Sequence, residues 1–237
     1  MSEKDSVEEA RRLVGNCVLF SGLSPDERAA IAARARIRTL AAGETVFTIG
    51  SAGDQMMALL SGTIRISVPS SDGKELVLAL LHPGEVFGEL SVLDGKERSA
   101  DAIAEDLCRL AILDRRDVLS FFERNPSAWP KLVGVLCQRL RHTDEVLAEV
   151  ALLQLPARLA RTMLRVLKTN VAAAQTAKKQ TGKIGFSQRE LGNMVGGTRE
   201  SVNKCLRKWQ SSGIVQISEG SIIITDRAAL EEIAAQA

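Results

Sequence analysis

Two neighbouring segments, Phe87-Gly88-Glu89-Leu90 and Arg98-Ser99-Ala100, contain the residue types that bind phosphate. An arginine can pair with the negative oxygens of a phosphate, and small residues leave backbone N–H groups free to donate to it. A carboxylate such as that of Glu89 can accept a hydrogen bond from a ribose hydroxyl. We therefore expect a pocket for a cyclic phosphate, lined by Arg98, the Ser99–Ala100 backbone, the Ser99 hydroxyl and Glu89. The alternative is a surface ion pair between Glu89 and Arg98.

A second group of polar residues follows the glycine pair Gly196-Gly197. The apolar residues around this pair have the spacing of the inward faces of two helices; they are Leu191, Val195, Val202, Leu206 and Trp209. The residues left outward near the start of the second helix are Arg199, Glu200, Asn203 and Lys204. Arg and Lys can pair with guanine O6 and N7, and Glu can accept from cytosine N4. The pattern predicts a helix that reads bases, although any solvated helix face carries similar charges.

Other residues nearby are suited to the DNA backbone. The Thr198 hydroxyl, Arg207 and Lys208 are placed for phosphates, which set register and affinity rather than sequence. At the start of the first helix, Ser187-Gln-Arg-Glu190 is a capping box, in which Ser and Glu each satisfy a free backbone donor. We include Ser187 and Gln188 among the expected DNA contacts.

The elements expected around these residues form a winged helix-turn-helix. One helix spans 157–167 and a polar surface loop spans 169–182. The two helices of the turn motif follow, the second over 199–210, and two short strands, 214–217 and 221–225, are joined by Glu219-Gly220. Residues 156–237 hold 13 Lys and Arg against 6 Asp and Glu, a net charge of +7, whereas the remainder holds 18 against 23, a net charge of −5. The basic end is suited to a polyanion such as double-stranded DNA.

The phosphate-binding residues fall in a region of short strands separated by Gly, Asp and Ser. The region runs from Arg38 to about Leu113, and regular short strands with turn signals predict a nearly closed antiparallel sheet, a β-roll or jelly roll. The expected strands are 44–49, 56–60, 63–68, 75–81, 100–104 and 108–113. Before this region, residues 6–35 have helical spacing, with a helix start at Ser24-Pro25.

A long helix is expected after Asn125-Pro126. Its apolar residues alternate in steps of three and four, which is the seam of a coiled coil and favours a homodimer; the seam residues are Val133, Leu136, Leu140, Thr143, Leu147, Val150 and Gln154. The alternative is that the stripe packs on the protein's own sheet. Pro156 breaks or ends this helix, which places a hinge near 152–156.

Composition narrows the class of protein. With 45% hydrophobic and 25% charged residues, the 237-residue chain is typical of a soluble globular protein. No run approaches the roughly 18 apolar residues of a membrane span, and the first residues lack a signal peptide, so we expect a cytoplasmic protein without a membrane partner. Cys17, Cys108, Cys137 and Cys205 lack metal-ligand spacing. We expect each cysteine to be a small buried hydrophobe, and no metal site.

The sequence resembles the cAMP receptor protein/FNR family of bacterial transcription regulators over nearly the whole chain after about residue 18. GEVFGELSVLDGKERSADAIA resembles the phosphate-binding cassette of that family, and FSQRELGNMVGGTRESVNKCLRKWQSSGIV resembles its DNA reader. The resemblance implies a homodimer along the long helix, a cyclic nucleotide in each β-roll, reorientation of the DNA-reading domains by that ligand, and binding to an imperfect palindrome. It assigns phosphate and ribose roles to Gly88, Glu89, Arg98 and Ser99, and base-reading roles to Arg199, Glu200 and Lys204. We also include Leu90, Ala100, Thr143 and Asp144 among the expected nucleotide-binding residues.

The resemblance also implies an α+β fold with three parts. Residues 1–126 would hold the N-terminal helices and the cyclic nucleotide-binding β-roll, 127–155 the dimerisation helix and hinge, and 156–237 the winged helix-turn-helix. The loop 169–182 lies where the family's loop contacts RNA polymerase, a further expected partner.

Two residues depart from the cAMP-responsive members. These members offer a Thr-Ser pair to adenine, from the bound subunit and its partner respectively, whereas this chain has Thr143-Asp144. A carboxylate can accept from the adenine amino group, but it can also accept from guanine N1 and N2 together. Beside cAMP, the ligand expected first, this residue therefore indicates cGMP or reduced discrimination between the two nucleotides, unless Asp144 only faces solvent. Lys204 stands where the cAMP receptor protein has an Arg. Because Lys lacks the planar guanidinium group, we expect the selectivity for the target DNA sequence to differ.

Other kinds of protein fit the sequence less well. An iron–sulfur sensor needs a cysteine cluster where only Cys17 occurs, and His82 and His142 are the only candidates for a haem ligand. A control module of an enzyme or channel would not need the basic C-terminal winged helix-turn-helix. An enzyme is disfavoured as well, because the sequence has no nucleophile–base pair, no HExxH motif and no Walker-type loop. A regulator of this fold that responds to another effector such as cyclic di-GMP, or to none, is disfavoured by Glu89, Arg98 and Ser99.

Overall fold

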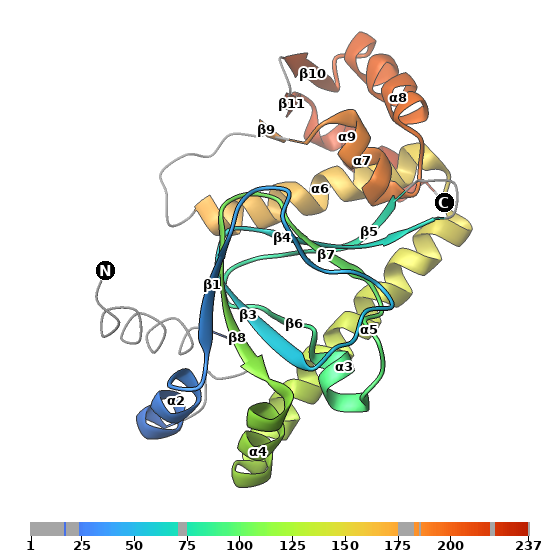
Figure 1. The fold of residues 1–237 in the computed structure, drawn as a ribbon. Helices are drawn as coiled ribbons and strands as arrows, with labels where there is room; N and C mark the ends of the chain where they lie inside the picture. The colour runs from blue at the N-terminus through green and yellow to red at the C-terminus, as the bar shows by residue number, and fades with distance from the viewer. Residues whose placement is uncertain are drawn as a thin grey trace. The chain divides into compact units, whose positions relative to one another are not determined.

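The computed structural model describes residues 17, 24–70, 75–174, 183–184, 186–218 and 221–236. The chain divides into two compact units (Figure 1), Met1–Pro69 with Val77–Arg141 and Ser70–Leu76 with His142–Ala237. This division falls inside the long helix α5 (Trp129–Leu152). The domain limits expected from the sequence stay a prediction.

The first unit contains two four-stranded sheets (Figure 1), with strand orders β1-β8-β3-β6 and β2-β7-β4-β5. The six expected strands are present with shifts at their ends, and the β-roll is confirmed. The sequence missed β1 and β6. The strands are β1 (Arg36–Leu40), β2 (Thr45–Phe47), β3 (Gln55–Ser61), β4 (Ile64–Pro69), β5 (Glu75–Leu81), β6 (Val86–Phe87), β7 (Asp101–Ala104) and β8 (Cys108–Asp114).

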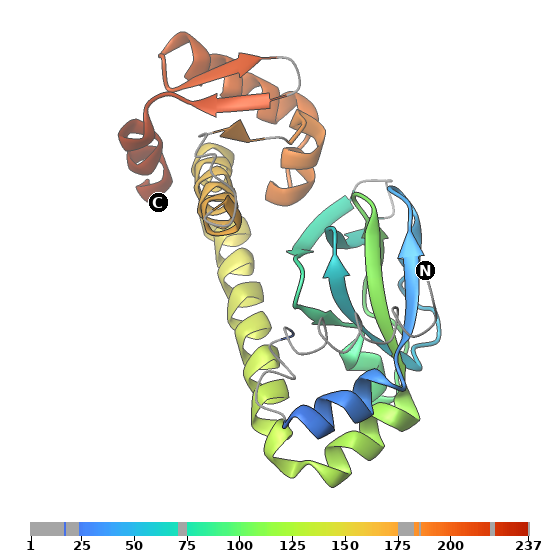
Figure 2. The same cartoon turned by 90° about the vertical axis from the view of Figure 1, so that its left-hand side faces the viewer.

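Strand β3 has an unbroken apolar centre because both of its faces are covered. Met57 and Leu59 belong to a core cluster that includes residues of both sheets. The alternate residues of β3 belong to a second cluster with Phe122 and Leu132. These two residues come from α4 (Arg115–Arg124) and α5, and Figure 2 shows α4 and α2 (Pro25–Ala32) beside the first turns of α5.

The helices of this unit only partly follow the expectation. Ser24 and Glu27 form a capping box at the start of α2, which confirms the expected start, but the helix ends at Ala32. Of the helical segment expected over 6–35, residues 6–16 and 18–23 lie outside the described residues. The sequence missed α3 (Glu89–Asp94), a short helix in a turn-rich segment, and α4, whose inward Val118, Phe121 and Phe122 are buried.

The expected seam of α5 is largely an exposed apolar stripe. Leu140 and Leu147 are 62% and 65% exposed, and Val133 and Val150 are exposed as well. For Val133 and Leu140, which lie in the same unit as the sheets, the alternative that the stripe packs on the protein's own sheet is wrong. Cys137 is exposed on the same helix, so the expectation that all four cysteines are buried is wrong for Cys137, while Cys205 is half-buried. Among the described residues, no helix is long and apolar enough to span a membrane.

The break after α5 lies where it was expected. Helix α5 ends at Leu152, and α6 (Leu155–Ala174) begins with Pro156 in its first turn, where proline is tolerated. Across the break, both guanidinium nitrogens Nη1 and Nη2 of Arg165 donate to the Glu149 carboxylate, at 2.9 and 3.1 Å. This bidentate pair joins α6 to the last turns of α5.

The second unit is a helix-turn-helix with a strand hairpin beside it (Figure 2), as expected. Two expectations were wrong: α6 continues through Ala174 rather than ending at Leu167, because its alanines favour helix, and a further helix, α9, follows the hairpin. Residues 175–182 of the expected loop lie outside the described residues. The elements are β9 (Lys183–Ile184), α7 (Gln188–Val195), α8 (Arg199–Ser211), β10 (Val215–Ser218), β11 (Ser221–Ile224) and α9 (Arg227–Ala235).

The capping box at α7 gives a stability prediction. The Ser187 hydroxyl accepts from Glu190 N, and the Glu190 carboxylate accepts from Ser187 N at 2.6 Å. We expect Ser187→Ala to lower the free energy of unfolding by about 1 kcal/mol, since one donor of the helix start loses its partner. Calorimetric unfolding measures this, with the exposed Ser212→Ala as control, expected within about 0.5 kcal/mol of the parent. Equal effects of the two substitutions would contradict the assignment.

Candidate functional site

Arg98 is held by the backbone of the loop between β2 and β3. Its N–H donates to the Ser51 carbonyl at 2.9 Å, and its own carbonyl accepts from Gly50 N at 2.8 Å. The side chain is only 5% exposed, which is rare for an arginine. The position of this side chain is therefore set by the loop and by the groups that surround its guanidinium.

The guanidinium of Arg98 is only partly satisfied. Its Nη1 donates to the Gly88 carbonyl and its Nη2 to the Gln55 carbonyl, both at 2.8 Å. Its central carbon lies 4.3 Å from the centre of the Phe47 ring, a cation–π distance. Its Nε is buried and has no hydrogen-bond partner among the described residues. A buried donor without a partner costs free energy, so this nitrogen is a place where an acceptor oxygen would be stabilised.

The charge of Arg98 persists in this setting. Burial lowers the pKa of its guanidinium, and the nearby Asp54 and Glu89 carboxylates oppose that shift. Because an arginine ordinarily keeps its proton far above neutral pH, the group is a cation at neutral pH. Arg98 therefore supplies a fixed, buried positive charge that an anion could neutralise.

Glu89 is buried beside Arg98 but pairs with a different arginine. Its side chain is 2% exposed, and its Oε1 accepts from Arg139 Nη1 at 2.5 Å. The other terminal nitrogen of Arg139 donates to the Val86 carbonyl. The alternative of a surface ion pair between Glu89 and Arg98 is wrong, since both side chains are buried. Sequence reasoning missed Arg139, because it lies 50 residues from Glu89 in the sequence and only the folded chain brings the two together.

The backbone turn at Gly88 is a second contact to the guanidinium. Gly88 precedes α3 with a φ of +74°, a left-handed conformation that suits glycine. A Cβ at this position would lie 2.6 Å from Arg98 Nη1. The positive φ of Gly88 and its short distance to the Arg98 guanidinium both favour glycine at this position, which is among the phosphate-binding residues expected from the sequence.

The other residues expected at the pocket differ in exposure. Ala100 is buried and Ser99 is exposed, and Leu90 is 47% exposed on α3. Thr143 and Asp144 are exposed on α5, in the second unit. The structure thus brings Gly88, Glu89 and Arg98 together with three residues that sequence reasoning missed. These are Phe47, Gln55 and Arg139.

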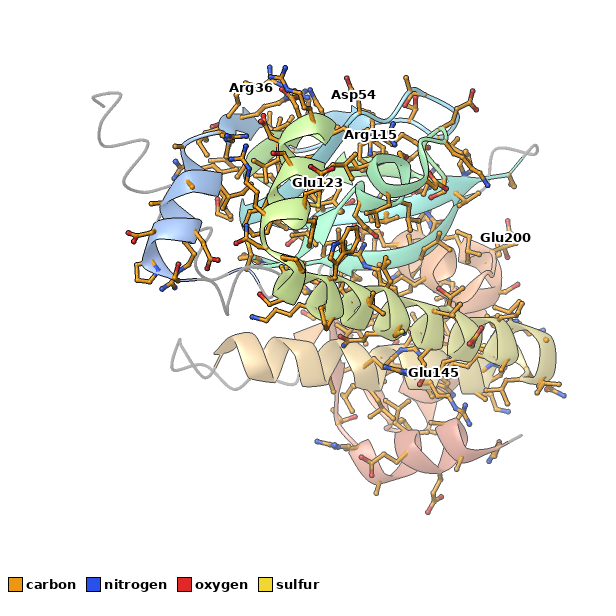
Figure 3. All side chains as sticks on the ribbon, turned by 90° about the horizontal axis from the view of Figure 1, so that it is seen from below. Arg36, Asp54, Arg115, Glu123, Glu145 and Glu200 are labelled. Carbon is orange, nitrogen blue, oxygen red and sulfur yellow. The ribbon has the colours of Figure 1, made fainter. Side chains whose placement is uncertain are left out.

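The second unit presents the expected DNA-reading residues on one helix. All five residues expected inward are buried in the core of this unit, which confirms that face. Gly196 ends α7 in a left-handed conformation and Thr198 begins α8, with its hydroxyl accepting from Ser201 N at 3.1 Å. The Glu200 side chain extends away from α8 in Figure 3. The exposed residues of the expected set are Ser187, Thr198, Arg199, Glu200, Lys204, Arg207 and Lys208, and the half-buried ones are Gln188 and Asn203.

Within the described residues, no group of three His, Cys, Asp or Glu side chains is arranged to hold a metal ion.

Two known domain types match the chain. A cyclic nucleotide-binding domain matches residues 37–125, and a Crp-like helix-turn-helix domain matches residues 157–233. The first match contains the Arg98 pocket, and the second contains α7, α8 and the hairpin.

Known proteins resemble the chain over most of its length. The CRP-like cAMP-activated global transcriptional regulator of Mycobacterium tuberculosis is 30% identical over 208 residues, which cover 88% of this chain and 92% of that protein. The cyclic AMP receptor protein of Thermus thermophilus is 32% identical over 216 residues, which cover 91% and 96%. Among solved structures, the c-di-GMP responsive regulator CLP of Xanthomonas campestris shares the fold, with a TM-score of 0.77 at 22% identity, covering 85% of this chain and 99% of that one.

The Mycobacterium tuberculosis relative is named as a transcriptional regulator and the Thermus thermophilus relative as a receptor protein, and neither is named as an enzyme. Together with the two domain matches, they confirm the resemblance that the sequence motifs indicated. The chain belongs to the cAMP receptor protein/FNR family and is a DNA-binding transcription regulator with a cyclic nucleotide-binding domain.

Proposed function

We propose that this regulator is a homodimer whose affinity for a palindromic DNA site is set by cAMP bound in the β-roll. The observation that carries the proposal is the buried Arg98 cation, whose Nε has no partner among the described residues. A cyclic phosphate supplies both the negative charge and the acceptor oxygen that this donor lacks. Glu89 then accepts from the ribose hydroxyl, and the Ser99 hydroxyl and backbone donate to the phosphate.

The exposed stripe of α5 supports the homodimer. Large apolar side chains are normally covered in a soluble protein, and a row of them at heptad spacing is typical of a two-helix seam. Leu140 and Leu147 lie one heptad apart and are the most exposed of the seam leucines. The stripe is covered by the same helix of a second copy of the chain, since a two-fold symmetric contact places the same surface on both sides of the interface.

Asp144 supports cGMP as a second candidate ligand. Its exposed carboxylate directly follows Thr143, at the position where cAMP-responsive members of the family offer a serine to the base. A carboxylate accepts two donors from the guanine edge but only one from adenine. Both nucleotides share the phosphate and ribose that Arg98 and Glu89 bind. Among these three residues, only Asp144 can therefore discriminate between cAMP and cGMP.

DNA reading is assigned to the exposed start of α8. Arg199 and Lys204 reach guanine, Glu200 reaches cytosine, and Asn203 lies on the same helix between them. Ser187, Gln188, Thr198 and Lys208 contact the backbone, which sets register. RNA polymerase remains the expected partner of the bound dimer.

The first test removes the cation of the pocket. We expect Arg98→Ala to weaken cAMP and cGMP binding at least about 100-fold, because the buried positive charge and its charge-assisted hydrogen bonding to the phosphate are lost. Isothermal titration calorimetry of the purified protein measures both affinities, with cyclic di-GMP titrated in parallel. Unchanged affinity in the variant, or a parent that binds only cyclic di-GMP or nothing, would remove the pocket assignment.

A second test concerns the base. We expect Asp144→Ser to shift the ratio of cGMP to cAMP affinity about tenfold towards cAMP, since the guanine edge loses a two-donor acceptor. The same calorimetric titrations give this ratio. A ratio that does not move shows that Asp144 faces solvent in the complex.

The DNA contacts are tested by two substitutions on α8. Arg199→Ala should lose about 1–3 kcal/mol of sequence preference per half-site, whereas Lys208→Ala should weaken cognate and random DNA about equally. Fluorescence anisotropy on a selected site and on random duplex, at one fixed salt concentration, measures both. If both variants affected the two DNAs equally, Arg199 would not read bases.

A further inference from the structure

Gly53, in the loop before β3, occupies a position where a side chain has no space. Its backbone is not left-handed, so glycine is not required there for its conformation. A Cβ at this position would lie 2.2 Å from Ser91 Cβ, 2.6 Å from Ser91 Oγ and 3.0 Å from Arg98 Nε. The first of these distances is far below a van der Waals contact between carbons, so the surrounding groups would have to move.

Ser91 cannot move away by rotating its side chain. Its Cβ is bonded directly to the backbone of α3, the helix that also carries Glu89, and the residue is 2% exposed. Its Oγ donates to the Glu97 carbonyl at 3.3 Å. A methyl group at position 53 would therefore displace α3, or the loop that contains Gly53, or both.

The loop is tied to the pocket on both sides of Gly53. Before it, Gly50 and Ser51 hold the Arg98 backbone; after it, the Gln55 carbonyl accepts from Arg98 Nη2. The carbonyl of Asp54 also accepts from Arg115 N at 2.7 Å, and Figure 3 shows these two residues close together. A shift of the loop would therefore move the Arg98 guanidinium.

We infer that Gly53 and Ser91 are a pair of complementary size that positions Arg98 and Glu89 for the nucleotide. Gly53 is a positioning residue, because it acts through the groups that bind the ligand. The inference rests on the proposed function for its ligand, while the steric contact is a property of the fold. Gly53 and Asp54 carry only a turn signal in the sequence, so this role emerges from the three-dimensional contacts.

The test is a compensation cycle of Gly53→Ala, Ser91→Gly and the double variant. Calorimetric titration with cAMP should show about tenfold or greater weakening in Gly53→Ala. Ser91→Gly should bind within about threefold of the parent, and the double variant should return to that range because the added methyl enters the space left by the hydroxymethyl group. Gly134→Ala, where an added Cβ meets nothing within 4 Å, is the control and should bind as the parent does.

Further measurements separate positioning from general damage. Ligand-free affinity for random duplex DNA should be the same in all variants, since that contact does not involve the pocket.

If Gly53→Ala is too unstable to purify, a double variant that folds and binds cAMP supports the inference, and one that does not fold or bind overturns it. Full binding by Gly53→Ala, or no recovery in the double variant, also overturns it. If the parent binds neither cAMP nor cGMP, the proposed function fails, and thermal unfolding of the same cycle still tests the steric pair.

Discussion

Burial of one guanidinium organises the nucleotide-binding unit. Moving a cation out of water is costly unless hydrogen bonds replace its hydration, and for Arg98 those bonds come from carbonyl groups on two separate segments. The segments can come close to the guanidinium only where their side chains are small. This explains why glycine occupies positions 88 and 53 beside the guanidinium. The remaining donor of the guanidinium, Nε, is buried and has no hydrogen-bond partner among the described residues. In this account, the same group holds the loops together and binds the phosphate.

Glu89 connects the surroundings of Arg98 to helix α5. This carboxylate pairs with Arg139 on α5, a helix that continues into the unit that carries the DNA-reading residues. A ribose hydroxyl that donates to Glu89 would join the same network as Arg139. The proposed ligand would therefore act on the helix that also carries the proposed dimer seam. Close packing between these groups makes such a network respond as a unit rather than residue by residue.

Sequence patterns predicted the elements whose period or capping signal is local. The six strands, the helix start at Ser24, the capping box at Ser187 and the inward face of α7 and α8 were all predicted. They follow from alternation, 3.6-residue spacing and side-chain hydrogen bonds between close neighbours. The two-residue strand β6 and the six-residue helix α3 were missed, because neither is long enough to show a period. Helix α6 extends past its predicted end at Leu167, because the helix propensity of its alanines outweighs the polar composition of this segment.

The residues of the candidate site were also predicted only in part. Gly88, Glu89 and Arg98 lie within one short segment, and their residue types alone indicated phosphate chemistry. Arg139, Phe47 and Gln55 come from other elements, and only the folded chain brings them to Arg98 and Glu89. The partner of Glu89 in particular required a contact between α5 and α3, which no local pattern encodes.

The most direct test of the account is the affinity of the protein for one selected palindromic duplex, measured by fluorescence anisotropy with and without saturating cyclic nucleotide. Allosteric coupling between two sites is typically 5- to 150-fold in affinity. The account predicts a change of at least about fivefold on adding cAMP or cGMP. The same affinity with and without either nucleotide would contradict it.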